Sequence, residues 1–217
     1  MCRNVVRNIL PIVNYMKILK SVTEHEVTAS LFKYNYSSFR FGEKLKAIIK
    51  EQGIDENIIT NPDVQNEKKN MIREKLMRSF DGDGVDGYLS QDFPNNIQWK
   101  LVRLTKKDIQ QIKYLNYSYW NELSNHKRYI SEGVKTIKKG IEIFNQSNDI
   151  FFKAFKALKQ GANFPPSILI AKDENSDLVA IDGHLRLTSY LFDSNYTPDE
   201  IDAYIGYSEN LATWPLY

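Results

Sequence analysis

The sequence predicts an α+β fold: a helical N-terminal region over residues 1–95, then, over residues 96–217, a domain with a small mixed β-sheet flanked by helices. Two observations predict this order. Apolar residues recur at helical spacing in the first region, and short apolar runs bounded by turn residues fill the C-terminal part. With 217 residues, 42% hydrophobic and 26% charged, the chain has a globular composition and can bury a core without disulfides.

Two helices are expected in the N-terminal region, because apolar residues there share one helical face. These residues are Phe41, Leu45, Ile48 and Ile49 in the first helix, and Ile72, Leu76 and Phe80 in the second. Gly53 is placed to end the first helix. The turn Asp81–Gly87 (DGDGVDG) suggests a calcium loop, but an EF-hand needs Gly at position six and Glu at position twelve, where this chain has Asp86 and Asp92. We therefore interpret it as a solvated turn.

Strands and helices alternate after Pro94. Ile97–Leu104 (IQWKLVRL) predicts a strand rich in apolar residues. A helical stripe follows at Ile130, Val134, Ile137 and Ile141, and Gly140 interrupts it. A further helix has a cap at Ser147 or Asn148, a buried face of Phe151, Ala154, Phe155 and Leu158, and an end at Gly161.

The strongest local pattern lies near the C-terminus. Two apolar runs, Ile168–Ala171 and Leu178–Ile181, are joined by polar residues and predict a β-hairpin. Asp182 and Gly183 follow directly. A short helix is then marked by Leu187, Tyr190 and Leu191, and Tyr204–Tyr207 (YIGY) predicts the last strand.

The cysteine content and hydropathy favour a cytoplasmic protein. Cys2 is the single cysteine, so no internal disulfide can form and a reducing environment is expected. Polar residues interrupt residues 1–16, so no apolar core of a signal peptide is predicted there. Because no run of about 18 apolar residues occurs, we expect no membrane partner.

Charge is unevenly distributed although the formal net charge is only +2. Residues 100–140 carry ten basic and three acidic side chains, whereas residues 193–217 carry five acids and no base. This asymmetry can create a potential that attracts an anionic partner, and nucleic acid is one candidate. The alternative is that the helix surfaces are simply rich in lysine.

The segment Ile181–Arg186 (IDGHLR) holds the residue types best suited to chemistry, at the junction of a predicted strand and helix. A helix N-terminus presents amide groups and partial positive charge, which suit a phosphate. Gly183 permits a sharp turn, and Arg186 offers donors to phosphate oxygens. His184 can transfer a proton near neutral pH, and Asp182 can orient it, hold magnesium or act as a base. The alternative is a common Asp–Gly turn with a helix cap and a surface ion pair.

This order of hairpin, Asp–Gly–His–x–Arg motif, short helix and final strand resembles the ParB/sulfiredoxin-like superfamily. Asp182, Gly183, His184 and Arg186 match its Asp–Gly–His–His–Arg motif, and Leu185 replaces the second His. The phrases YWNELS, FPPSILIA and IDGHLRLTSYLF look like an uncharacterised bacterial branch. The resemblance covers Ile97 to Tyr217 and implies a site for nucleotide phosphates. A sulfiredoxin is disfavoured, because His184 stands at the reactive cysteine position.

Secondary candidates lie in the segment 114–128 (YLNYSYWNELSNHKR). Arg128 is a candidate for phosphate binding and Glu122 for catalysis. Trp120 could stack on a base, but its spacing from Tyr117 favours a shared core face. The three histidines are not closely spaced, so no metal site is expected.

These observations give a nucleotide- or phosphate-binding protein as the leading hypothesis. A nucleotide-dependent phosphotransferase acting on a small molecule is its enzymatic form, with Asp182, His184 and Glu122 as catalytic candidates and a nucleoside triphosphate with magnesium as the candidate cofactor. Gly183, His184, Arg186 and Arg128 would then contact the phosphate. The alternatives are a nucleic-acid-binding or nuclease-like module and a non-catalytic interaction protein that uses its helical region.

Overall fold

The computed structural model describes residues 16–79 and 93–217. Its centre is a mixed sheet of five strands in the order β1-β2-β5-β3-β4. The strands are β1 (Lys17–Val22), β2 (Gln98–Thr105), β3 (Ser167–Ala171), β4 (Val179–Asp182) and β5 (Glu200–Tyr207). All neighbouring pairs are antiparallel except β3 and β5, which are parallel. The predicted α+β fold and the hairpin of β3 and β4 are confirmed.

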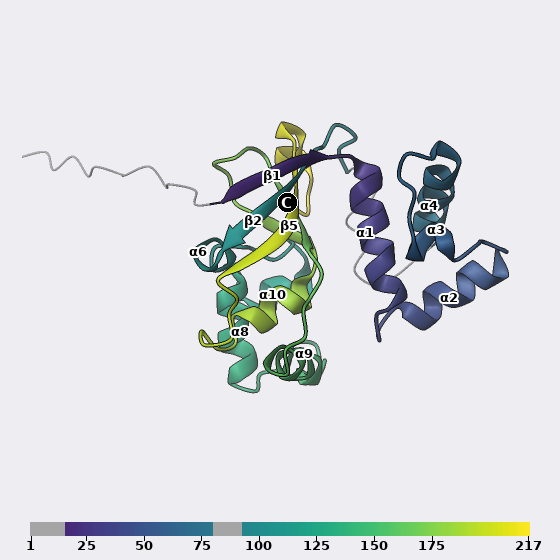
Figure 1. The fold of residues 1–217 in the computed structure, drawn as a ribbon. Coiled ribbons are helices and arrows are strands. Elements are labelled where there is room, and N and C mark those ends of the chain that lie inside the picture. The colour runs from purple at the N-terminus through teal and green to yellow at the C-terminus, as the bar shows by residue number, and fades with distance from the viewer. Residues whose placement is uncertain (1–15, 80–92) are drawn as a thin grey trace, which may run out of the picture.

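Helices form two groups around this sheet (Figure 1). The first group is α1 (Glu24–Tyr36), α2 (Gly42–Glu51), α3 (Asn57–Thr60) and α4 (Glu67–Ser79). The second group is α6 (Lys106–Ile109), α7 (Ser118–Leu123), α8 (Ile130–Lys138), α9 (Asp149–Lys159) and α10 (His184–Tyr190), followed by the 3₁₀ turn Glu209–Thr213. In Figure 1, α8, α9 and α10 gather beside β2 and β5, whereas α1 to α4 lie to the other side of the sheet.

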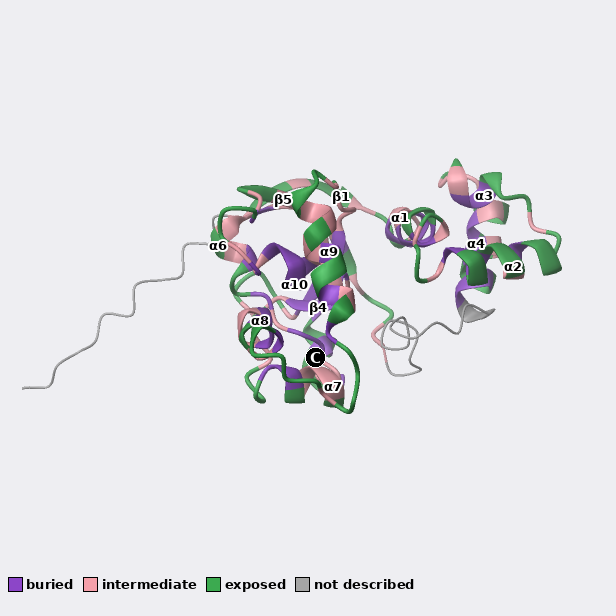
Figure 2. Ribbon diagram, turned by 90° about the horizontal axis from the view of Figure 1, so that it is seen from below, coloured by how far each residue is buried: buried purple, intermediate pink, exposed green. Residues whose placement is uncertain are grey.

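Strand β3 explains why the sheet is the core of the molecule. All five of its residues are buried, as a central strand covered on both faces requires. Ile168 and Ile170 belong to the apolar cluster that includes the N-terminal helices, and Leu169 and Ala171 to the cluster of α8, α9 and α10. Figure 2 shows buried residues along β4 and α10, next to this strand in the chain's interior. The sheet therefore gives the hairpin and the motif after it a rigid base.

The N-terminal helices begin and end where local chemistry requires. Thr23 and Glu26 form a capping box at the start of α1, because each side chain satisfies the backbone N–H of the other. In α2 the predicted face is confirmed at Leu45 and Ile49, which are buried. Gly53 has a φ of 62°, a conformation that glycine adopts without the strain of a Cβ.

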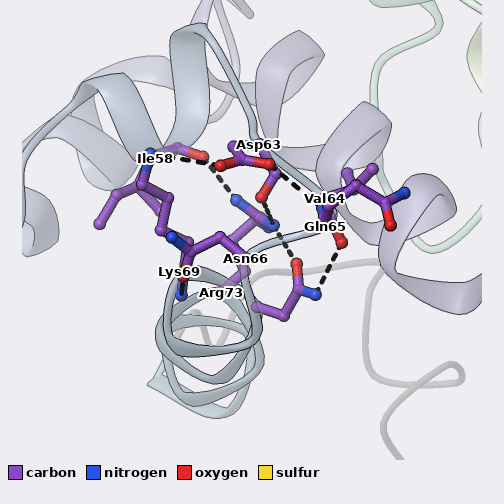
Figure 3. Close-up of polar contacts among 8 residues, drawn as sticks. Ile58, Asp63, Val64, Gln65, Asn66, Lys69 and Arg73 are labelled. Atoms are coloured by element: carbon purple, nitrogen blue, oxygen red, sulfur yellow. Dashed lines mark hydrogen bonds and ion pairs between the residues drawn. The ribbon is translucent and has the colours of Figure 1, made fainter.

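A buried arginine organises the loop between α3 and α4. Arg73 is 1% exposed and its guanidinium donates to the carbonyl oxygens of Ile58 at 3.0 Å and Asp63 at 3.1 Å, and to the side-chain oxygen of Asn70. Asn70 in turn donates to the carbonyl of Val64 at 2.9 Å. Figure 3 shows Arg73 inside the loop that these groups close. Polar bonds thus hold this loop around a desolvated cation.

Strand β1 is the largest departure from the sequence-based expectation of a purely helical region. Residues 17–22 pair antiparallel with β2, and Val22 lies opposite Trp99. The first strand of the sheet therefore comes from within residues 1–95. β1 is an edge strand whose residues are exposed or half-buried, so it shows none of the apolar alternation by which strands are predicted.

Smaller predictions are settled by burial and helix ends. Ile141 is 47% exposed, because α8 ends before it and Gly140 turns the chain with a φ of 72°. Tyr117 precedes α7 and is 55% exposed, so its predicted core face with Trp120 is wrong. The turn Asp81–Gly87 and the residues Phe80 and Cys2 lie outside the described residues. In the described part of the chain, no helix combines the length and the apolar character needed to cross a membrane.

Candidate functional site

The predicted motif lies at a sharp junction of strand and helix. Strand β4 ends at Asp182, and Gly183 caps α10 with φ 92° and ψ 14°. A Cβ at this glycine would lie 2.3 Å from Ser167 Oγ, so the side chain of Ser167 already occupies the space that any other residue at position 183 would need.

Three amide groups follow this turn without acceptors. In the described structure no group accepts a hydrogen bond from the backbone N–H of His184, Leu185 or Arg186, and the first bond of the helix is from Leu187 N–H to the Gly183 carbonyl at 2.9 Å. The Asp182 side chain does not cap the helix. Unpaired N–H groups at a helix start carry partial positive charge, so they favour an anion.

Arg186 reaches back across one helical turn to Asp182. Its Nη2 donates to Asp182 Oδ2 at 2.5 Å and weakly to the Pro166 carbonyl at 3.5 Å. Both side chains are half-buried, 20% and 26% exposed. The Nε of Arg186 is buried and has no partner in the described structure. The pair is therefore fixed in place, with part of the hydrogen-bonding capacity of Arg186 unused.

His184 lies in a stack of three nearly parallel rings. Its ring centroid is 4.7 Å from that of Trp120 and 6.1 Å from that of Tyr114, with interplanar angles of 8° and 18°. Trp120 also stacks on Tyr114 at 4.6 Å. The Tyr114 hydroxyl bonds to Thr188 Oγ1 at 2.7 Å, and Thr188 donates to the carbonyl of His184 at 2.7 Å. The stack thus holds both the ring and the backbone of His184.

Burial is the main cause that lowers the pKa of His184 to about 4. The nearby Asp182 and a hydrogen bond with the backbone of Ala180 act in the opposite direction, and the charges of Arg186 and Arg40 add smaller lowering effects. The imidazole is therefore neutral at pH 7. Its Nε2 is buried and has no hydrogen-bond partner within the described residues. A neutral ring with an unpaired nitrogen can accept a hydrogen bond from a bound group once that group reaches it.

Arg128 does not serve the site as predicted. Its guanidinium donates to the Tyr114 carbonyl at 3.1 Å and 2.9 Å, and to the Tyr217 carbonyl at 3.0 Å. Its own carbonyl accepts from the Tyr114 N–H at 2.7 Å. Because these donors hold backbone oxygens, we assign Arg128 a structural role and remove it from the phosphate-binding set.

Glu122 also has a different environment from the one predicted. Its carboxylate lies 3.3 Å from His126 Nε2, and both side chains are exposed, 47% and 69%. This surface pair belongs to the end of α7 and the turn after it, so Glu122 makes no described contact with the motif. Trp120 is half-buried and contacts protein rings, which agrees with its predicted packing role.

Part of the basic excess of residues 100–140 is compensated by acids from other elements. Ion pairs join Lys100 to Glu174, Arg103 to Asp202 and Lys113 to Asp177. Glu132, which pairs with Lys127 and Lys135, belongs to the segment itself. These contacts add no support to the prediction of a nucleic-acid groove.

Open hollows occur on the surface away from the motif. One, of about 500 Å³, lies between α9 and the chain after α10, and another, of about 470 Å³, lies between Tyr34 of α1, Phe164 and the start of β5. Neither is lined by residues 182–186.

Comparison of the chain with protein-family models, curated proteins and solved structures gives no match. The resemblance to the ParB/sulfiredoxin-like superfamily therefore stays a prediction from the motif and the order of elements.

Sequence reasoning missed the residues that support the motif. Ser167 fills the space beside Gly183, and Thr188 links Tyr114 to the backbone of His184. Arg40, from the turn between α1 and α2, lies near enough for its charge to act on His184. These contacts join residues far apart in the chain, so no local pattern indicates them.

Proposed function

We propose that the turn from Asp182 to Arg186 binds a phosphate group of a small molecule, with nucleotides as the first class to test. One observation carries this proposal: three consecutive amide groups without acceptors follow the left-handed Gly183, beside a fixed arginine. Amides at a helix start and an arginine together supply the donors that phosphate oxygens accept.

The orphan nitrogens of the motif support the same proposal. Arg186 Nε is a donor and His184 Nε2 an acceptor, and both are buried without partners in the described structure. Unpaired buried polar atoms cost free energy, so a ligand that pairs them is stabilised. A phosphate oxygen suits Arg186 Nε, and a hydroxyl of the same ligand suits the neutral His184.

The residues at the motif fit a phosphate better than a protein-held magnesium ion. Asp182 is the carboxylate of the motif, and its Oδ2 accepts from Arg186. Among residues 16–79 and 93–217, no group of three His, Cys, Asp or Glu side chains is arranged to hold a metal. The proposal is therefore phosphate binding, with any magnesium brought by the nucleotide itself.

A thermal-shift screen tests the proposal, with pyrophosphate, ATP and CTP, each with and without magnesium. A ligand at 100 times its dissociation constant stabilises the fold by about 2.7 kcal/mol. Calorimetry should then find that Arg186→Ala weakens binding by about 1.5–3 kcal/mol, the scale of a charged hydrogen bond. The control is Arg103→Ala, which breaks an arginine–aspartate pair on β2 and β5 instead. Equal affinity of Arg186→Ala and the unaltered protein would refute the proposal.

A further inference from the structure

A second surface feature, which residues 182–186 do not line, lies between α9 and the residues that follow α10. Six side chains define what we term the basic aromatic hollow: Lys138, Phe152, Phe155, Lys156, Lys159 and Phe192. Its volume is about 500 Å³, and it opens to solvent. The hollow combines an apolar floor with a rim of lysines.

The floor is built from aromatic rings that pack against one another. Phe155 stacks on Phe192 at 5.3 Å, and Phe152 contacts Phe192 edge-on at 5.5 Å. Tyr196 extends the floor by an edge contact with Phe155 at 5.9 Å. Phe152 is 46% exposed and Tyr196 43% exposed. Exposed aromatic surface gathered in one place is typical of a binding site.

The three lysines of the rim have no ion-pair partner in the described part of the chain. Lys46, Lys100 and Lys113, by contrast, each contact a carboxylate within 3.0 Å. Lys138, Lys156 and Lys159 face one hollow, and the acid that lines it, Asp193, bonds to the N–H of Asn195. The hollow thus has a net positive charge, which favours an acidic partner.

We propose that the basic aromatic hollow docks an acidic peptide segment of a partner protein, which packs one apolar side chain against the exposed ring of Phe152. The lysines favour this occupant over single-stranded nucleic acid, because they already cover the ring faces on which bases would stack. Lys159 Nζ lies 5.3 Å from the centre of the Phe155 ring and 6.0 Å from that of Tyr196. Lys138 Nζ lies 6.0 Å from the centre of the Phe192 ring.

The peptide's chemistry follows from the same geometry. An apolar side chain of the peptide that packs on the aromatic rings is stabilised because its surface leaves water. Carboxylates on both sides of that residue can then contact the lysines at the rim. Asp193 interrupts the rim, so a continuous phosphate backbone meets a repulsive charge there, whereas a peptide can place a neutral residue opposite it.

Fluorescence anisotropy with the full chain tests this docking. The probe is a labelled heptapeptide with a central phenylalanine between aspartates and glutamates, and its matched control has serine at the centre. We expect the phenylalanine peptide to bind about tenfold more tightly, and its binding to weaken with salt because the exposed charges are screened. Lys156→Glu and Phe152→Ser should each weaken it at least about fivefold.

Two matched variants control for charge and apolar surface. Lys50→Glu changes an exposed lysine of α2, and Phe39→Ser removes a side chain that is 79% exposed before α2. Both should leave binding unchanged within about twofold. Circular dichroism melting checks that each variant folds.

Three results would overturn the proposal. The first is equal binding of the two peptides, or of the hollow variants and the unaltered protein. The second is that the protein binds an oligothymidine but not the peptide, and that Lys156→Glu abolishes the binding of the oligothymidine. The third is self-association in sedimentation that Phe152→Ser abolishes, since the occupant would then be a second copy of the chain.

Discussion

Replacement of Gly183 by alanine tests the reasoning about the turn that carries the motif. The added Cβ would lie 2.3 Å from Ser167 Oγ and 2.8 Å from Ser167 Cβ, and the residue would keep a φ of 92°. A left-handed conformation costs a residue with a Cβ roughly 1–2 kcal/mol, and overpacking costs roughly 1–3 kcal/mol. Gly183→Ala should therefore destabilise the protein by about 2–5 kcal/mol.

The two costs can be separated with a second substitution. Ser167→Gly removes the two closest atoms that the new Cβ would meet and leaves Arg186 Nη2, the end of a long side chain, at 3.0 Å. In that background Gly183→Ala should therefore cost little more than the conformational part, about 1–2 kcal/mol. Gly140→Ala is the matched control, because its φ is 72° and no atom lies within 4 Å of its Cβ position. Its cost should be similar in both backgrounds.

Urea denaturation followed by tryptophan fluorescence measures the free energy of unfolding of the unaltered protein and of each variant. A Gly183→Ala cost that is equal with and without Ser167 would show that the two residues do not meet, and a cost below about 0.5 kcal/mol would contradict the left-handed turn itself.

Three further predictions follow from buried polar groups. Arg73→Met should destabilise the protein by about 3–5 kcal/mol in urea denaturation, because the carbonyls of Ile58 and Asp63 lose their donor; a neutral result would show that solvent reaches them. The free energy of unfolding should fall by up to about 1.4 kcal/mol per pH unit as the pH drops from 6.5 toward 4, because His184 becomes protonated in the unfolded chain but stays neutral in the folded protein. His184→Gln should flatten this part of the stability profile, and an unchanged slope in that variant would contradict the lowered pKa. Trp120→Ala should raise the pKa of His184 toward 6.5 in an NMR titration, since the stacked ring helps exclude water. A pKa that stays near 4 would show that residues other than Trp120 bury the imidazole.

The central strands and the motif were predictable because their signals are local. Ile168–Ala171 reads as a buried strand from its apolar run, and Gly183 marks the turn in which it is observed. Edge strand β1 was not predictable, because Lys17 and Lys20 face solvent and leave no apolar alternation. Its place is set by the ladder with β2, which a single sequence does not display.

The chemistry of the site was predictable in its residue types and less so in its pairings. Asp182 and Arg186 are one helical turn apart, so their pairing follows a local rule that could have been applied. The role of Arg128 could not be foreseen, since its acceptors lie 14 and 89 positions away. Arginine suits carbonyl oxygens as well as phosphates, so residue type alone does not decide between them.

Strand β1 also changes how the gene would be divided into modules. Val22 and Trp99 face each other in the ladder, so the helices α1 to α4 leave and re-enter the sheet at adjacent points, as an insertion within a hairpin. Truncation at residue 96 would remove β1 and make β2 the edge strand, with unpaired amides and carbonyls that can pair with another chain. A minimal module is better made by joining Val22 to Gln98 through a tight reverse turn, which keeps β1 paired with β2.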